Sequence, residues 1–305
     1  MDNRKHIVLD SVEAYNDLHG FETLHPLVGV VDMKDGRPLT VSCTIDYGIY
    51  ALFLKQSVCC SILYGRRAYD YQKGTVVSFA PGQTIGFDPM PDDGTPAECL
   101  GLVFHPDLIR GTELARNIHR FSFFNYLSNE ALHLSERERQ VFEDCLGNIR
   151  QELEHAIDSH SRQLIVSNIE LLLNYCMRFY DRQFITRDMV NTEILSDFER
   201  MLNEYFAAGK ALEHGLPSVR YFADKACLSA NYFGDLIKRK TGRTAQEYIQ
   251  FKLVEMAKDR LAGTSDTVTL IAESLGFQYP QHFARLFKRN TGLTPNQYRE
   301  QLAAR

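Results

Sequence analysis

Apolar residues in the last third of the chain recur with helical spacing, and the pattern occurs twice. Two segments place them at positions i, i+3 and i+4: Phe233, Leu236 and Ile237 in the first, and Phe283, Leu286 and Phe287 in the second. This spacing puts the apolar side chains on one face of an α-helix. Basic residues followed by Thr-Gly close each segment, which is typical of a helix end. The pattern therefore predicts two amphipathic helices of the same layout.

These two helices belong to a longer internal repeat. Residues 233–248 and 283–298 are identical at eight of sixteen aligned positions, namely Phe, Leu, Lys, Arg, Thr, Gly, Thr and Tyr. Upstream, Ala223-Asp224 aligns with Ala272-Glu273 at an offset of 49 rather than 50, so the second copy has one added residue in the turn. Two copies of about fifty residues are too few for a solenoid, which needs about three or more. The repeat therefore predicts a pair of similar small modules.

Each module has the layout of a helix-turn-helix. Ser218 can cap the first helix of one module before a turn at Cys227-Leu228, and Thr267 and Gly276 take these places in the other. We expect one helix-turn-helix over about 218–240, the other over about 267–290, and a linker helix over about 244–262. A helix of about 18 residues spans ~27 Å. This length suits two recognition helices that enter successive major grooves, about 34 Å apart.

The N-terminal part follows a different pattern, with short apolar runs between turn residues over residues 20–105. The runs are Leu27–Val31, Tyr50–Leu54, Val58–Tyr64, Thr75–Phe79 and Leu100–Phe104. Short strands at such spacing favour a sandwich or a small barrel.

Helical spacing returns from about Ser135 to Tyr180. Two apolar stripes, Val141–Leu153 and Leu164–Met177, flank a polar break at residues 158–160 and predict a helical hairpin. The hairpin either packs on the β-rich part alone or forms a dimer interface. A further helix near Glu193–Phe206 precedes a short hinge at residues 207–209.

Charge is distributed unevenly, and this changes what the net charge of −5 implies. Residues 209–305 contain 15 Lys and Arg against 9 Asp and Glu, a net charge of +6, and the other 208 residues contain 19 against 30, a net charge of −11. A basic segment on an acidic body indicates either a binding partner or a chance clustering of charge. Seven scattered cysteines without a Cys-x-x-Cys pair indicate neither a disulfide framework nor a zinc site, and they fit a cytoplasmic protein.

The C-terminal segment resembles the DNA-binding domain of the AraC/XylS family of bacterial transcription regulators over roughly residues 210–300. The residues that carry the resemblance are Ile271–Phe277, Phe283–Arg289, Thr291–Pro295 and Tyr298-Arg299. Residues 278–282 and Gly234-Asp235 depart from the usual family pattern. The resemblance implies an α+β chain with three parts: a cupin-like, effector-sensing β-barrel over residues 1–130, a helical dimerisation and linker region over 131–208, and an all-α DNA-binding domain over 209–305.

The family fold implies which side chains meet DNA. Asn231, Gly234 and Asp235 would lie in one major groove, and Gln281, His282 and Arg285 in the next. Asn and Gln pair well with adenine, Arg with guanine, and Asp with cytosine. Asp235 would read a base, repel phosphate, or orient a neighbouring basic side chain. The residues expected to contact phosphate, which positions the protein without reading sequence, are Ser218, Lys238, Arg239, Thr267, Lys288 and Arg289.

The effector site and the rival functions depend on fewer observations. Aromatic residues in the β-rich part suit a small-molecule pocket, with Tyr50, Tyr64 and Arg66 as the candidates. A cupin-type metalloenzyme with an appended DNA-binding domain is the alternative, but its His-x-His pair is missing, since His19, His25 and His105 are isolated. An N-terminal domain that senses a protein partner is a third reading.

We therefore expect a DNA-binding regulator rather than an enzyme, with no catalytic residues, metal or cofactor. Its expected partners are double-stranded DNA, a small-molecule effector, a second copy of the chain, and RNA polymerase if it is an activator. No apolar run approaches the ~20 residues that a membrane span needs, so no membrane partner is expected.

Overall fold

The chain forms two compact units, Met1–Thr186 (unit 1) and Arg187–Arg305 (unit 2). The computed structural model describes residues 5–55, 63–64, 67–68, 74–89, 98–127, 130–156 and 158–303. The division falls inside the region 131–208 that the sequence analysis treats as one, because the helices of that region pack with different units.

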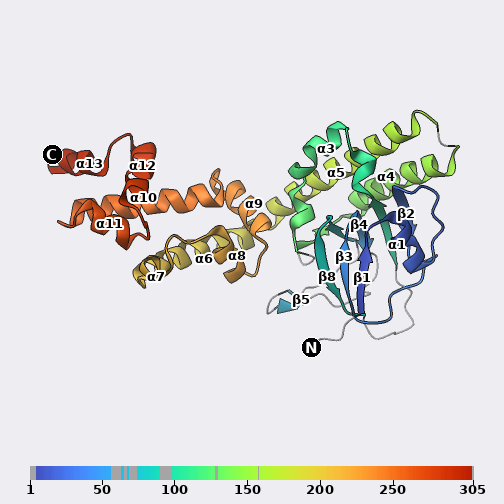
Figure 1. Ribbon diagram of the computed structural model, residues 1–305, viewed down its shortest axis with the longest axis horizontal. Coiled ribbons are helices and arrows are strands. Elements are labelled where there is room, and N and C mark those ends of the chain that lie inside the picture. Colours follow the sequence, from blue (N-terminus) through green and yellow to red (C-terminus); the bar gives the residue numbers. More distant parts are fainter. Residues whose placement is uncertain are drawn as a thin grey trace. The chain divides into compact units, whose positions relative to one another are not determined.

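The strands of unit 1 form two main sheets (Figure 1). One has the order β1-β3-β8, comprising Lys5–Leu9, Cys43–Tyr47 and Gln83–Phe87, with β1 parallel to β3. The other has the order β10-β7-β4-β9-β2, comprising Leu132–His133, Thr75–Phe79, Tyr50–Lys55, Cys99–Phe104 and Val28–Asp32, and its neighbouring strands are antiparallel. A short ladder joins β5 (Leu63–Tyr64) to β6 (Arg67–Ala68).

The core of unit 1 lies between the two main sheets. On β4, Ala51 and Phe53 join the same buried cluster as Ile45 and Tyr47 of β3, and successive strand residues point to opposite faces. Leu52 of β4 is nevertheless completely buried, so the outer face of the five-stranded sheet is covered as well. Helices supply this cover, which makes unit 1 a stack of sheet, sheet and helices.

The α+β fold class is confirmed, whereas the expected closed barrel is not formed by the described residues. The two sheets share no ladder in the part of the chain that the structure describes. They are held together by side chains, such as Tyr47 and Phe79 with ring centroids 4.8 Å apart, rather than by backbone hydrogen bonds around a ring. Four of the predicted apolar runs coincide with β2, β4, β7 and β9 to within a residue. The fifth, Val58–Tyr64, lies mostly outside the described residues.

The helices of unit 1 include the predicted hairpin, α4 (Glu136–Glu154) and α5 (Ser161–Thr186). Its inner face has the predicted stripes, with Phe142, Ile149, Ile169 and Leu173 completely buried. The shorter helices are α1 (Val12–His19), α2 (Pro106–Ile109), α3 (Glu113–Asn117), η1 (Ile118–Arg120) and η2 (Ser122–Asn125). Helix α1 was not predicted, although Ser11 caps its start and Gly20, with φ of +75°, ends it.

Unit 2 consists of helices. They are α6 (Asp188–Ala207), α7 (Lys210–His214), α8 (Val219–Lys225), α9 (Ala230–Thr241), α10 (Ala245–Gly263), α11 (Val268–Ser274), α12 (Pro280–Thr291) and α13 (Pro295–Ala303). Unit 2 begins before residue 209 because α6 packs with the first module. The ring of Phe198 on α6 lies 5.0 Å from Phe222 and 5.1 Å from Phe233, centroid to centroid.

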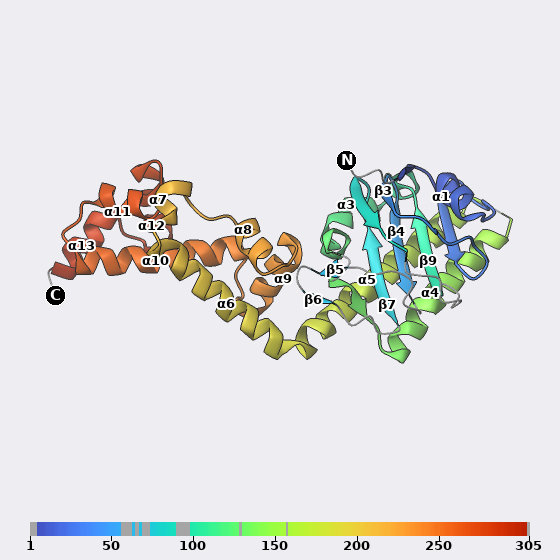
Figure 2. The same cartoon turned by 90° about the horizontal axis from the view of Figure 1, so that it is seen from below.

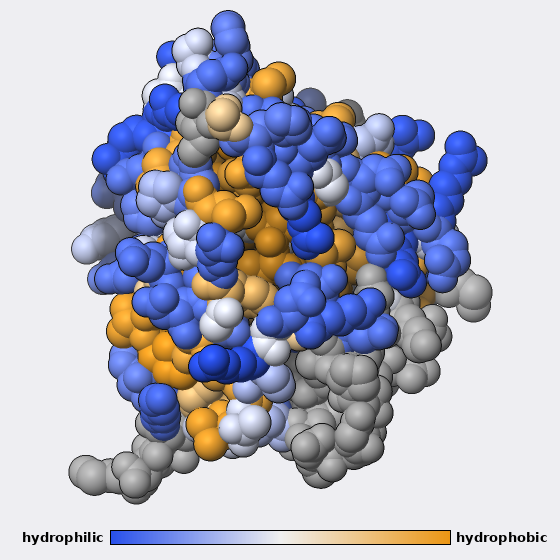
Figure 3. All heavy atoms as spheres, turned by 90° about the vertical axis from the view of Figure 1, so that its right-hand side faces the viewer, coloured by the Kyte–Doolittle hydropathy of each residue, from blue (hydrophilic) through white to orange (hydrophobic). Residues whose placement is uncertain are grey.

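The surface of unit 1 is not uniformly polar. Figure 3 shows apolar side chains between polar ones on the face of unit 1 that it views. The large apolar side chains exposed in the described part of unit 1 are Val8, Leu24, Val41, Leu127, Leu164, Leu171 and Ile185.

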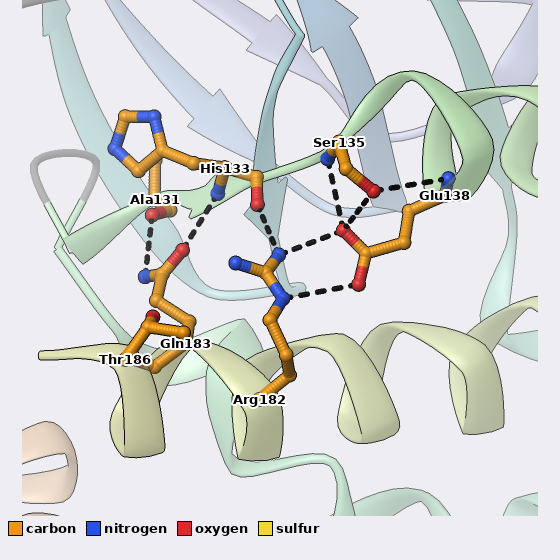
Figure 4. A network of polar contacts seen from close by, with 7 residues as sticks. All are labelled: Ala131, His133, Ser135, Glu138, Arg182, Gln183 and Thr186. Carbon is orange, nitrogen blue, oxygen red and sulfur yellow. Dashed lines mark hydrogen bonds and ion pairs between the residues drawn. The ribbon is translucent and has the colours of Figure 1, made fainter.

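A polar network joins the end of α5 to β10 and to the start of α4 (Figure 4). Arg182 donates to both carboxylate oxygens of Glu138, at 3.0 and 2.8 Å, and to the carbonyl oxygen of His133 at 2.6 Å. Gln183 accepts from the backbone N–H of His133 at 2.8 Å. Glu138 also accepts from Ser135 in a capping box. Arg182 of α5 thereby links all three elements, because it contacts Glu138 of α4 and His133 of β10.

We expect Glu138→Gln to lower the free energy of unfolding by about 1–2 kcal/mol at neutral pH, since charge-assisted hydrogen bonds are lost. Burial alone would raise the pKa of Glu138, but hydrogen bonds from Ser135 and Arg182 outweigh it and lower the pKa. The ionised Glu138 carboxylate therefore contributes its full stabilisation above the unfolded-state pKa of about 4.3. This stabilisation disappears as the pH falls through the lower folded-state pKa.

Denaturant titrations of wild type and variant between pH 3 and 7 measure this difference. Glu143→Gln, which disrupts an i,i+4 surface pair with Arg139, is the control and should change stability by less than about 0.5 kcal/mol. A difference between wild type and Glu138→Gln that persisted in acid would contradict the assignment to the ionised carboxylate.

Candidate nucleic-acid interface

Both predicted modules are helix-turn-helix units with the same capping chemistry. Ser218 begins α8 and accepts a hydrogen bond from the Tyr221 N–H at 3.1 Å, and Thr267 begins α11 and accepts from the Leu270 N–H at 3.2 Å. Each cap satisfies a backbone donor that the first helical turn leaves unpaired. Ser229 caps α9 in the same way, whereas α12 starts with Pro280 in its first turn.

The turns of the two modules adopt the same left-handed backbone conformation with different residues. Cys227 has φ of +56° and the equivalent Gly276 has φ of +87°. A Cβ built at position 276 would lie 2.9 Å from the carbonyl carbon of Gly215 and 3.0 Å from the carbonyl oxygen of Ala211. Glycine is therefore required at 276 both for its conformation and for this close backbone approach.

Helix α10 is the predicted linker helix, and it is shared by both modules. Its 19 residues correspond to a length of about 28 Å. It starts with a complete capping box between Thr244 and Glu247. Figures 1 and 2 show α9 near one end of α10 and α11 and α13 near the other. The linker thus separates the modules by a fixed helical distance.

The start of α10 is also tied to α6 by charge. Glu199 of α6 accepts a hydrogen bond from the Tyr248 hydroxyl and forms an ion pair with Lys252 at 3.0 Å. The hydrogen bonds from Tyr248 and then Lys252 lower the pKa of Glu199. Burial, and then the hydrogen bond to Glu199, raise the pKa of Tyr248. These contacts hold α6, α10 and the first module in one unit.

The candidate base-reading residues occupy the two recognition helices α9 and α12. Asn231 is exposed near the start of α9, and Asp235 is half-buried one turn later. On α12, Gln281, His282 and Arg285 are all exposed. Each helix therefore brings its candidates together, whereas its aromatic residues face the core, as predicted for Phe233, Phe283 and Phe287.

The candidate phosphate-binding residues lie at the helix ends. Lys238 and Arg239 are exposed in the last turn of α9, and Lys288 and Arg289 are exposed in the last turn of α12. Positive charge at these ends is also what the helix dipole favours. Ser218 and Thr267 are exposed caps at helix N-termini, where backbone N–H groups can face an anion.

Helix α10 was predicted only as a linker, but it also carries polar residues beside α12. Arg289 donates to the side-chain oxygen of Gln250 at 2.8 Å, which links α12 to α10. Gln246 is exposed one turn earlier, and Arg243 stacks over the Phe251 ring at 4.0 Å. Gln246 and Gln250 stand four residues apart and therefore lie on one face of α10. This spacing was the sequence signal for a polar face on the linker helix.

The candidate effector residues are only partly described. Tyr50 is half-buried, with its ring 4.9 Å from Phe104 and 5.1 Å from Phe124, centroid to centroid, and burial raises its pKa. The side chain of Tyr64 and the whole of Arg66 lie outside the described residues. Among the described residues, no group of three or more His, Cys, Asp and Glu side chains is placed to hold a metal ion. No described helix is long and apolar enough to cross a membrane.

Comparison with known proteins gives a matching family model and several similar chains. A family model described as a helix-turn-helix domain matches residues 222–301. The chain is 38% identical over 71 residues to YobQ of Bacillus subtilis, an uncharacterized HTH-type transcriptional regulator, which covers 23% of this chain and 30% of that protein. It is 29% identical over 136 residues to the HTH-type transcriptional activator RhaS of Escherichia fergusonii, which covers 44% of this chain and 46% of that protein. The chain thus spans less than half the length of either relative.

Solved structures of similar segments are also known. The DNA-binding domain of AdpA in complex with a target DNA is 28% identical, with a TM-score of 0.29, and the match covers 34% of this chain and 93% of that one. The C-terminal domain of a response regulator, yesN, from Fusobacterium nucleatum is 27% identical, with a TM-score of 0.31, and covers 34% and 95%.

We expect opposite outcomes from glycine exchanges at the two equivalent turns. Gly276→Ala should lower the free energy of unfolding by at least about 2 kcal/mol, because a strained backbone and a backbone clash combine. Cys227→Gly should raise it by up to about 1 kcal/mol, because the left-handed strain is relieved. Denaturant unfolding followed by circular dichroism measures both. Equal effects at the two turns would contradict the close approach found at Gly276.

Proposed function

Because the C-terminal part of this chain is an AraC-type helix-turn-helix domain, we propose that the protein is a sequence-specific DNA-binding transcription regulator. The observation that carries the proposal is the repeated module. Two equivalent helices, α9 and α12, each expose candidate base-reading residues, and both are attached to one linker helix. A single chain can thereby contact two successive segments of a major groove.

The chemistry of the exposed residues supports two different roles. Arg285 can donate two hydrogen bonds to guanine, and Gln281 and Asn231 can pair with adenine. Lys238 and Lys288 stand at helix ends, where their charge meets phosphate and positions the domain. The net charge of +6 over residues 209–305, against −11 for the rest, directs the basic domain toward the duplex.

Unit 1 is proposed to sense a small-molecule effector. The half-buried Tyr50, whose ring packs on the buried rings of Phe104 and Phe124, supports an aromatic wall for such a site. A ligand that binds one arrangement of the protein more tightly than another shifts the population toward it, and this would control DNA binding. The regulator would act in the cytoplasm and contact RNA polymerase if it is an activator.

Helix α5 supports the proposal of a homodimer. Leu164 is 48% exposed and Leu171 is 46% exposed, and the two stand seven residues apart on the outer face of α5. A seven-residue apolar spacing is typical of helices that pair side by side. These leucines lie opposite the buried stripe, so the hairpin can cover the sheet and pair with a second copy at the same time.

Exchange of Arg285 should separate base reading from phosphate contact. Arg285→Ala should weaken binding to a selected operator by about 1–3 kcal/mol and leave binding to random duplex nearly unchanged. Lys288→Ala should weaken both and reduce the salt slope by about one ion. Fluorescence anisotropy at several salt concentrations, with a duplex obtained by selection from a random pool, measures these effects. Equal losses on both duplexes for Arg285→Ala would remove it from the base-reading residues.

Exchange of Leu171 should test the dimer. Leu171→Glu should raise the dimer dissociation constant at least about tenfold, because a charge would be buried in the interface. Leu24→Glu is the matched control, since Leu24 is 49% exposed in a loop of the same unit. Analytical ultracentrifugation measures both. A wild-type chain that sediments as a monomer, or two variants that behave alike, would refute this interface.

A further inference from the structure

A groove of about 330 Å³ lies in unit 2 between α10 and α12. Its lining includes the apolar residues Ile249 and Leu253 of α10 and Leu286 of α12, and Leu216, in the loop before α8, borders it. Small-molecule pockets have volumes of roughly 300–1,000 Å³, so the groove is large enough for a small ligand.

The polar residues that line this groove are basic or neutral. Arg285 and Arg289 of α12 line it together with His282, and none of its described lining residues is Asp or Glu. The hydrogen bond from Arg289 to Gln250 holds the guanidinium of Arg289 beside α10. An apolar surface and fixed positive charge therefore occur in the same groove.

The equivalent positions of the first module are closed. Tyr232 and Leu236, which correspond to His282 and Leu286 in the repeat, are only 5% and 1% exposed. Helix α6 packs beside α9, and Lys240 at the end of α9 donates to Thr192 of α6 at 2.8 Å. In the second module His282 is exposed and Leu286 only half-buried. One recognition helix is thus supported by α6, and the other borders an open groove.

We propose that this groove binds a small amphipathic anion, a carboxylate or sulfonate on an apolar body, and that the bound anion excludes DNA. The acid group pairs with Arg285 and Arg289, and the apolar body packs on Leu216 and Leu286, next to the buried side chains of Ile249 and Leu253. The bound anion excludes DNA because His282 and Arg285 line the groove and are also candidate base-reading residues. Only the exclusion of DNA rests on the proposed function. An anion bound in this groove would inhibit DNA binding independently of the proposed effector site in unit 1.

The test uses the full-length chain and 8-anilinonaphthalene-1-sulfonate, a fluorescent amphipathic anion. Leu216→Asp places a carboxylate beside the groove and should weaken binding of this dye to the groove at least about tenfold through charge repulsion. Leu212→Asp is the matched control, because Leu212 is 65% exposed on α7 and does not line the groove. Dye bound elsewhere contributes equally to all variants, so the difference between them isolates the groove.

A second variant shows whether weaker dye binding in Leu216→Asp comes from the added charge or from partial unfolding. Gln246→Glu also places a carboxylate at the groove, and it does so in the first turn of α10, where the helix dipole favours an acid. It should keep the thermal midpoint of wild type and weaken dye binding to a similar degree. A selected DNA duplex should displace the groove-bound dye from wild type.

The outcomes separate the two proposals. Dye affinities that are equal in Leu216→Asp, Gln246→Glu and the control would overturn the groove site, even if DNA binding is specific. Loss of DNA affinity in Leu216→Asp with unchanged dye binding would also overturn it and assign the groove to the DNA interface. Dye that stays in the groove when DNA binds would overturn the exclusion. Failure to select any DNA sequence would refute the proposed function, while the dye comparison would still decide the groove.

Discussion

Helix α10 is the constraint on which the DNA-binding unit depends, because one rigid helix supplies core residues to both modules. Near its start, the ring of Tyr248 lies 5.7 Å from Phe198 of α6, centroid to centroid. Near its end, the carbonyl oxygen of Leu261 accepts a hydrogen bond from Arg299 of α13 at 3.3 Å, and Arg260 contacts Ser274 of α11. A helix fixes both rise and rotation per residue. The spacing and the relative orientation of α9 and α12 are therefore set together.

The two modules share a sequence pattern, but different helices pack around them. Helix α6 packs beside α9 of the first module through Phe198 and Phe233. Tyr232 of α9 is buried, whereas the matching His282 of the second module is exposed. The two recognition helices consequently differ in what they present. Asp235 lies half-buried on α9, and the equivalent Arg285 is exposed on α12. Helix α12 carries no acidic residue, whereas α9 carries Asp235.

Unit 1 is packed differently, because its five-stranded sheet is buried on both faces. Phe53 faces the other sheet, and the neighbouring Leu52 is buried on the opposite face. The helices on that face are joined to the sheet region by directed bonds, since Arg182 and Gln183 of α5 both bind the backbone of His133 on β10. The outer side of α5 keeps Leu164 and Leu171 exposed, which is why a second copy is proposed there.

The sequence by itself determined the local structure of both units. Helical spacing located α4, α5, α9 and α12, the repeat located the paired turns at Cys227 and Gly276, and apolar runs located four strands. These features depend on residues close together in the chain, such as a cap and the N–H three residues later. Helix α1 and strands β3 and β8 were missed, although Ser11 and Gly20 marked the ends of α1.

Only the tertiary structure decided how these elements combine. Whether strands close into a barrel depends on ladders between distant segments, and in the described residues they form two main open sheets and one short two-stranded ladder. His282 is exposed and the equivalent Tyr232 is buried, although the repeat gives both the same position. The groove beside Arg289 is formed together with residues of α10, about forty positions earlier in the chain. Burial and electrostatic pairing are properties of such distant neighbours, so the spacing of residues along the chain could not reveal them.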